Sequence, residues 1–125
     1  MTVLDPPTDR SSDLNRIRLL NDRCRQGRDP AARILITANC LAAFAPGEEL
    51  ESELLAQAGL MAAVSSFTFA EDDRTERDFG EVAVDGRSVW FKIDYYDAAL
   101  EFGSENPADA SATRRVLTIM LPEDY

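Results

Sequence analysis

A β-hairpin is the feature of this sequence that most restricts its fold. The pair Asp85-Gly86 separates two runs of alternating residues, which is the strongest short-range signal for a hairpin. Both central residues of a type I′ turn have a positive φ, which Asp and Gly tolerate. This turn sets the register, so that Val82 faces Val89 and Glu81 faces Trp90. The core face then carries Val82, Val84, Val89, Phe91, Ile93 and Tyr95, and the other face carries Glu81, Ala83, Ser88, Trp90, Lys92, Asp94 and Tyr96.

Two helices are predicted before the hairpin. The first runs from Asp13 to Gln26, with Ser11 or Ser12 as its cap. Its apolar residues recur at helical spacing and predict a core stripe of Leu14, Ile17, Leu20 and Cys24. The second helix is predicted to run from Glu48 to Ser65. Its start is indicated by Glu48, Glu49 and Glu51, since acidic residues are favoured in the first turn of a helix. Its predicted core stripe is Leu50, Leu54, Ala58, Met61 and Ser65, widened by Leu55 and Ala62.

Two more strands complete the predicted fold. Residues 33–37 form a short strand, and residues 42–46 form a connection. Residues 115–121 form a strand that is apolar on both faces, which predicts a central position in the sheet. The order α-β-α-β-β-β indicates an α+β two-layer sandwich, in which a four-stranded, mostly antiparallel sheet carries two helices on one face. Residues 1–10 are expected to be a flexible arm, and residues 11–125 a single domain.

Charge and composition restrict the function. The net charge is −10, and residues 48–125 hold six Lys/Arg against eighteen Asp/Glu. Such a surface argues against direct binding of nucleic acid or of an anionic membrane. The chain has no histidine and no glycine-rich phosphate-binding motif, so the common nucleophilic and nucleotide-binding sites are absent. We therefore expect a protein that is not an enzyme and needs no cofactor.

The two cysteines and the hydropathy pattern indicate a location. Cys24 and Cys40 have neither a zinc-binding nor a disulfide-framework spacing, and free buried thiols are typical of a reducing cytoplasm. The N-terminal residues have no pattern of a secretory signal. The longest uncharged run, residues 54–70, falls short of a membrane span. We expect a cytoplasmic protein.

Four stretches resemble the family called domain of unknown function 3768, whose members are small bacterial proteins that are frequent on mobile elements. They are DFG at Asp78–Gly80, FKIDYYD at Phe91–Asp97, GSENPAD at Gly103–Asp109, and TRRVLTIMLPEDY from Thr113 to Tyr125. Weaker similarity covers Arg16–Asp22 and Ile34–Ala38. The resemblance implies no activity and no functional residue, because the family has none assigned.

An acidic strip is the first candidate site. It consists of Glu71, Asp72, Asp73, Glu76 and Asp78, together with Glu49 and Glu53 one helical turn apart. Such a strip can imitate a phosphate backbone and occupy a basic nucleic-acid-binding surface of another protein. The alternative is an acidic face that only contacts solvent. With the mobile-element association, the strip predicts a non-enzymatic anti-defence inhibitor, of the anti-CRISPR or anti-restriction type, whose partner is a basic defence complex.

Two further interpretations stay open. Trp90 and Tyr96 share the polar hairpin face, where they bind a partner unless the connection at residues 97–113 folds over them. Asp94, Asp97 and Glu101 could instead bind a divalent cation in a small metal-assisted enzyme. Cys24 lies at a core position of a helix and has no partner base, so a nucleophilic role is disfavoured.

Overall fold

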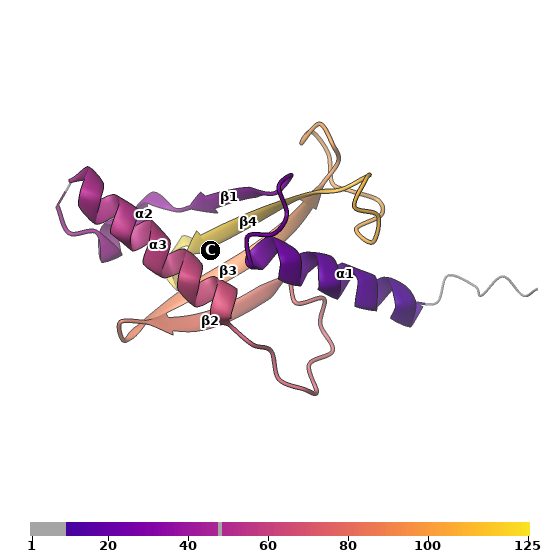
Figure 1. The fold of residues 1–125 in the computed structure, drawn as a ribbon, viewed down its shortest axis with the longest axis horizontal. Helices are drawn as coiled ribbons and strands as arrows, with labels where there is room; N and C mark the ends of the chain where they lie inside the picture. The colour runs from indigo at the N-terminus through magenta and orange to yellow at the C-terminus, as the bar shows by residue number, and fades with distance from the viewer. Residues whose placement is uncertain (1–9, 48) are drawn as a thin grey trace, which may run out of the picture.

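A four-stranded sheet and two long helices form the protein (Figure 1). The computed structural model describes residues 10–47 and 49–125. The elements in chain order are α1 (Arg10–Arg25), β1 (Arg33–Ile36), α2 (Ala38–Phe44), α3 (Leu50–Ser66), β2 (Phe79–Val84), β3 (Arg87–Tyr96), β4 (Arg114–Met120) and the short 3-10 helix η1 (Pro122–Asp124). The arm predicted for residues 1–10 lies outside the described residues, apart from Arg10, with which α1 begins. Glu48 also lies outside them.

The sheet is mixed, and its strand order is β1-β4-β3-β2. β4 pairs in parallel with β1 and antiparallel with β3, and β2 pairs antiparallel with β3. The sheet is therefore mostly antiparallel, as predicted, with one parallel pair. The predicted central position of the last strand is confirmed, since β4 buries Leu117 and Ile119 on one face and Val116 and Met120 on the other.

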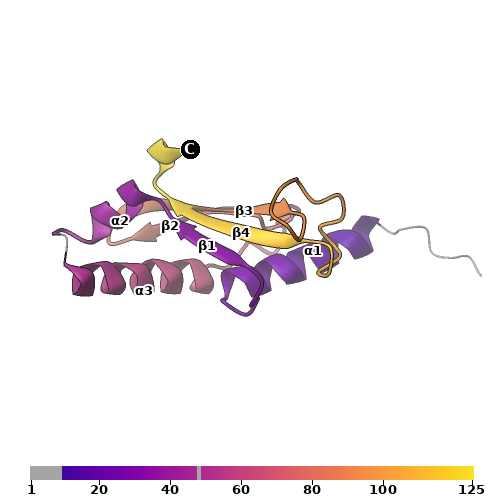
Figure 2. The same ribbon diagram turned by 90° about the horizontal axis from the view of Figure 1, so that it is seen from above.

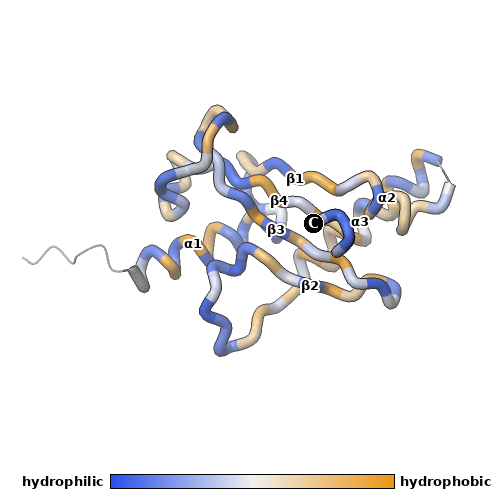
Figure 3. Tube along the Cα trace, turned by 180° about the vertical axis from the view of Figure 1, so that it is seen from behind, coloured by the Kyte–Doolittle hydropathy of each residue, from blue (hydrophilic) through white to orange (hydrophobic). Residues whose placement is uncertain are grey.

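α1 and α3 cover the same face of the sheet, and η1 lies on the opposite side (Figure 2). The α+β class and the two-layer arrangement are thus confirmed. Seen from behind, the strands lie in front of the helices, and apolar and polar residues alternate along them (Figure 3). We call this second face, which α1 and α3 do not cover, the open sheet face.

The hairpin has the predicted register. Glu81 pairs with Trp90, Val82 with Val89, and Val84 with Arg87. The turn residues have the expected positive φ, 49° at Asp85 and 79° at Gly86. Val89, Phe91 and Ile93 point into the core between sheet and helices, and the core cluster is completed by Cys24, Cys40, Leu60, Val64, Leu117, Ile119 and Leu121.

α1 buries three of the four residues of the predicted stripe, leaves Leu14 half-buried, and also buries two polar side chains. Ile17, Leu20 and Cys24 are buried, and so are Asn21 and Arg25. Arg25 Nη1 donates hydrogen bonds to the carbonyl oxygens of residues 64, 65 and 67, at 2.9, 3.2 and 2.6 Å. A cation at this place satisfies the free carbonyls at the C-terminal end of α3 and opposes their partial negative charge. The predicted serine caps are wrong, because α1 begins at Arg10 and residues 11 and 12 fall within its first turn.

α2 is a helix that the sequence analysis did not predict. The Thr37 hydroxyl accepts a hydrogen bond from the Cys40 N–H at 3.2 Å, which caps the first turn. The helix has only seven residues, which is too short for a clear periodic pattern. It buries Cys40 and packs Ala43 and Phe44 against the core. The chain therefore has an additional short helix between β1 and α3.

α3 exposes most of the face that was predicted to be buried, although Met61 of the predicted stripe packs against the core. Its buried residues are Ala56, Leu60 and Val64, whereas Leu50, Leu54 and Leu55 are 71%, 54% and 74% exposed. The prediction failed because the helix is apolar on all sides, so periodicity could not select the buried face.

Candidate partner-binding site

Three aromatic side chains gather on the open sheet face. The Trp90 ring packs edge to face against Phe79, with ring centres 5.2 Å apart, and against Tyr125, at 5.9 Å. Phe79 is 41% and Tyr125 75% exposed, and Trp90 is half-buried between them. We call Phe79, Trp90 and Tyr125 the aromatic cluster. Phe79 and Tyr125 thus both pack on Trp90 while much of their own surface stays accessible.

Polar groups border the aromatic cluster. Trp90 Nε1 donates a hydrogen bond to Glu81 Oε2 at 2.6 Å, and this bond is the main cause of the lowered pKa of the Glu81 carboxyl. Lys92 Nζ lies 5.5 Å from the centre of the Tyr125 ring and 3.3 Å from Asp94 Oδ1. The border of the cluster therefore has two carboxylates, Glu81 and Asp94, and one lysine that is already paired.

The η1 segment places Tyr125 on Trp90. The Asp124 carboxylate accepts hydrogen bonds from Thr37 Oγ1 at 2.6 Å, from Asn39 Nδ2 at 2.9 Å and from the Leu121 N–H at 3.0 Å. The bond from Thr37, followed by that from Asn39, lowers the pKa of Asp124. These contacts fix η1 to the junction of β1 and α2, so the position of Tyr125 depends on residues far away in the sequence.

Tyr96 lies at the other end of the open sheet face. Six residues along β3 separate it from Trp90, a distance of about 20 Å. It lines a hollow of about 250 Å³ with Leu35, Leu100 and Val116. The connection at residues 97–113 reaches this end, where Gly103 forms a bridge with Tyr96. The connection at residues 97–113 thus contacts the end of the open sheet face at Tyr96. At Trp90 the neighbouring side chains are instead Phe79 and Tyr125.

The predicted acidic strip is divided into two separate groups. Glu49 is the N-cap of α3, and Glu53 lies in the first turn of that helix. The loop at residues 71–78 follows the other end of α3, as Figure 1 shows. A helix of 17 residues spans about 25 Å. The structure therefore does not bring Glu49 and Glu53 together with the loop carboxylates.

Two acidic residues of the loop, Asp73 and Glu76, take part in the contacts that hold it. The Asp73 carboxylate accepts hydrogen bonds from Thr75 Oγ1 at 2.9 and 3.0 Å, and its carbonyl oxygen accepts one from Arg18 Nη2 at 2.8 Å. Glu76 Oε1 accepts a hydrogen bond from the Tyr95 hydroxyl at 2.7 Å. The Asp73 carbonyl and the Glu76 carboxylate therefore hold the loop against α1 and β3, and the Asp73 carboxylate is already bonded to Thr75 within the loop.

The remaining loop carboxylates differ in exposure. Asp78 is half-buried, and burial is the main cause of its raised pKa. Arg77 interrupts the acidic run and pairs with Asp22, its Nη1 lying 2.7 Å from Asp22 Oδ2. Glu71 and Asp72 are exposed. The acidic surface that this loop presents to a partner is consequently smaller than the sequence predicted.

The residues of the metal-assisted alternative have other contacts. Asp94 pairs with Lys92, and Asp97 Oδ1 accepts a hydrogen bond from the Glu101 N–H at 3.0 Å. Across residues 10–47 and 49–125, no group of three or more His, Cys, Asp or Glu side chains is placed to hold a metal ion. The geometry of the described residues gives this alternative no support.

Both cysteines are core residues. Burial raises the pKa of the Cys24 thiol to about 12 and that of Cys40 to about 11. Both thiols are free and neutral at neutral pH, and a neutral buried thiol is a poor nucleophile. The core position predicted for Cys24 is confirmed.

Sequence reasoning missed two members of the aromatic cluster. Strand alternation does place Phe79 on the same face as Glu81, so extending the hairpin by one residue would have found it. Tyr125 has no such signal, because it follows a 3-10 turn that the Asp124 contacts orient.

No helix in the described part of the chain is long and apolar enough to cross a membrane.

One protein family matches most of the chain. The curated proteins and the solved structures contain no match to the chain. A family model described as "Protein of unknown function (DUF3768)" matches residues 45–124, which include α3, three of the four strands and the aromatic cluster apart from Tyr125. Since the match covers more than half of the sequence, the chain belongs to the DUF3768 family.

Proposed function

We propose that this protein is a non-enzymatic binding protein that docks on a partner protein through the open sheet face. The observation behind the proposal is the aromatic cluster, whose rings pack on one another and remain partly exposed. Tyrosine and tryptophan are enriched at the energetic centres of protein interfaces, surrounded by a polar rim. Glu81 and Asp94 lie at such a rim here.

The charge of the protein indicates the chemistry of the partner. The chain has a net charge of −10, and Glu81 and Glu123 are exposed next to the aromatic cluster. Complementary charge speeds association and disfavours partners of like charge. The proposed partner therefore presents basic groups around an apolar depression that accepts the rings. Its contact with this protein weakens as salt concentration rises.

An anti-defence inhibitor, of the anti-CRISPR or anti-restriction type, is one form of this proposal. A defence complex that holds nucleic acid offers a basic surface, and the net charge of −10 favours such a target. The exposed Glu71 and Asp72 support a contact that imitates phosphates, although Glu49 and Glu53 lie at the far end of α3. In this form of the proposal the protein acts in the cytoplasm. It competes with nucleic acid for the same groove of the partner, so the two cannot be bound there together.

The test compares three variants against one captured partner. Tyr125→Ala removes an exposed ring, and at a hot spot such a truncation costs about 2 kcal/mol or more, roughly a thirtyfold loss of affinity. The triple neutralisation Glu71→Gln, Asp72→Asn and Asp73→Asn removes the loop charges. The pair Leu54→Gln and Leu55→Gln changes the exposed face of α3. Binding kinetics are measured at two salt concentrations for each variant.

The proposal expects Tyr125→Ala to increase the dissociation rate while the other two variants leave it unchanged. Thermal unfolding provides the folding control, because Tyr125 is exposed and its loss should leave stability nearly unchanged. Loss of binding only in the loop variant would favour the phosphate-imitating contact instead. Loss of binding only in the α3 variant would move the interface to the opposite side of the protein.

A further inference from the structure

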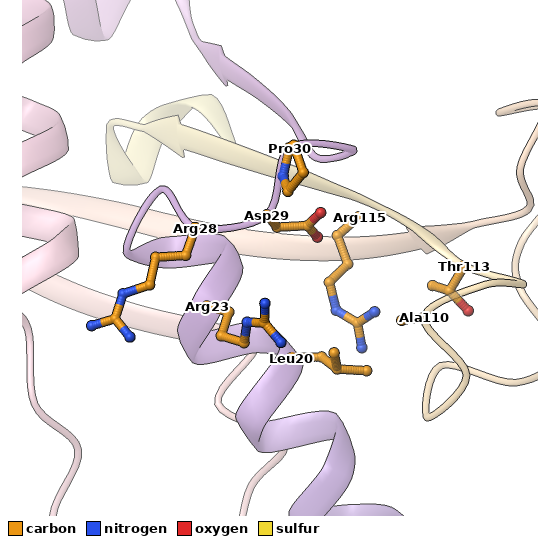
Figure 4. A pocket seen from close by; sticks show the side chains of 8 residues that line it. All are labelled: Leu20, Arg23, Arg28, Asp29, Pro30, Ala110, Thr113 and Arg115. Carbon is orange, nitrogen blue, oxygen red and sulfur yellow. The ribbon is translucent and has the colours of Figure 1, made fainter.

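A basic hollow lies beside the C-terminal half of α1, in a protein that is otherwise acidic. It has a volume of about 100 Å³, room for a few water molecules or one small oxyanion. α1 contributes Arg23, the following turn contributes Arg28 and Asp29, and the beginning of β4 contributes Arg115 (Figure 4). The guanidinium groups of Arg23 and Arg115 and the carboxylate of Asp29 point toward one another, whereas the Arg28 guanidinium points away from them (Figure 4).

Arg115 is buried without a carboxylate partner. The residue is 1% exposed, and its Nε and Nη2 donate hydrogen bonds at 2.6 Å to Asn21 Oδ1 and to the Pro107 carbonyl oxygen. Both acceptors are neutral, and the guanidinium lies 5.1 Å from the centre of the Tyr95 ring. Within the described residues Arg115 forms no salt bridge, and its Nη1 has no hydrogen-bond partner. A buried cation is normally paired directly with an anion, whereas Asp29 and Glu76 act on Arg115 from beyond salt-bridge distance.

The other charged groups of the hollow are also available. Arg23 and Arg28 are exposed, and neither forms a salt bridge within the described part of the chain. Figure 4 shows the side chain of Arg23 extending toward Arg115, and the carboxylate of Asp29 also pointing toward Arg115. One oxygen of Asp29 accepts the Ala31 N–H at 3.0 Å. The hollow therefore combines several donors with one acceptor.

We propose that this hollow binds hydrogen phosphate. The planar guanidinium groups of Arg115 and Arg23 suit the tetrahedral oxygens of phosphate, to which arginine forms paired hydrogen bonds. Asp29 would repel an oxyanion that has no proton, such as sulfate. Hydrogen phosphate keeps one P–OH group at neutral pH, and that group can donate a hydrogen bond to the Asp29 carboxylate. The carboxylate thus makes the site selective for phosphate over sulfate.

The test titrates the protein with sodium phosphate and, separately, with sodium sulfate at pH 7.5 and constant ionic strength. The arginine Nε–H resonances are followed by NMR. The expected result is a saturable shift of the Arg115 and Arg23 signals, with a Kd on the order of 1 mM or tighter for phosphate. The Arg74 signal, from the exposed loop, should not respond. Methyl phosphate in a third titration distinguishes the free ion from a phosphate monoester as the ligand.

Two substitutions test the residues of the site without removing the buried Arg115. Arg23→Gln should weaken phosphate binding about tenfold, whereas the matched control Arg74→Gln should leave it unchanged. Asp29→Asn should abolish the preference for phosphate over sulfate. Shifts that rise linearly with phosphate up to 50 mM, or equal weakening by Arg23→Gln and Arg74→Gln, would overturn the proposal.

Discussion

Replacing Gly80 with alanine would place a methyl group in the tightest part of the core. Gly80 lies opposite Phe91 in the hairpin, and a Cβ atom at this position would overlap with Cε2 and Cζ of the Phe91 ring. On its other side the methyl group would lie 3.2 Å from Cε1 of Phe67. Phe91 is fully buried and packs edge to face on Phe67 and Phe69, so its ring cannot withdraw without moving both.

The expected loss of stability follows from two opposing effects. Adding a methyl group to a packed core costs about 1–3 kcal/mol. Replacing glycine by alanine also reduces the freedom of the unfolded chain, which offsets about 0.4–1 kcal/mol. The net loss lies between about 0 and 2.6 kcal/mol, and we expect Gly80→Ala to lower the free energy of unfolding by about 1–2 kcal/mol, the middle of this range. The corresponding fall in Tm is roughly 3–10 °C for a domain of this size.

Urea unfolding followed by circular dichroism measures this change. Gly59→Ala is the matched control, because a Cβ atom at Gly59 would have no neighbour within 4 Å. That helical substitution should increase stability by about 0.5–1 kcal/mol. Combining Gly80→Ala with Phe91→Leu should cost less than the sum of the two single changes. If Gly80→Ala stabilises the protein as much as Gly59→Ala does, the proposed packing of Phe91 on Gly80 is refuted.

Four further predictions concern titration, side-chain burial and the hairpin turn. Stability should stay nearly constant between about pH 6 and 8, since the chain has no histidine. Above pH 9 the free energy of unfolding should fall by about 1.4 kcal/mol per pH unit for Cys24 alone, because the unfolded thiol ionises while the folded one keeps its proton up to a pKa of about 12. In urea unfolding, Cys24→Ala should lose less stability than the unmodified protein between about pH 9 and pH 10. Leu60→Ala should cost about 2–5 kcal/mol and the exposed Leu55→Ala less than about 0.5 kcal/mol, and equal costs would mean that α3 buries another face. Gly86→Val should cost about 1–3 kcal/mol, since φ is 79° at this residue, and a neutral result in thermal unfolding would contradict the strained turn.

The hairpin and the last strand could be predicted because local rules decide them. The Asp85-Gly86 turn fixes the register of the whole hairpin, and the two apolar faces of residues 115–121 require a covered strand. α3 could not be oriented in this way, because Leu54 and Leu60 are equally apolar and only packing against the sheet distinguishes them. β1 and β4 are separated in the chain by two helices and the hairpin. Their parallel pairing therefore depends on long-range packing, which no local pattern encodes.

The candidate site was predictable only in part, for a similar reason. Alternation on β3 placed Trp90 and Tyr96 on one face, and the structure agrees. The acidic strip failed as a continuous surface because the predicted helix itself lies between its two parts, and α3 holds them at its opposite ends. The basic hollow had no sequence signal, since Arg23 and Arg115 are 92 positions apart and meet only through packing of α1 on β4.

Site-specific photocrosslinking in the source cells tests the proposed docking face most directly. A photoreactive phenylalanine analogue is placed in turn at Tyr125, in the aromatic cluster, and at Leu55, on the exposed face of α3. Both side chains are about equally exposed, at 75% and 74%, so the two positions are matched for access to solvent. The proposed function predicts a discrete crosslinked partner from position 125 and none from position 55. A partner captured from position 55 and not from position 125 would contradict docking through the open sheet face.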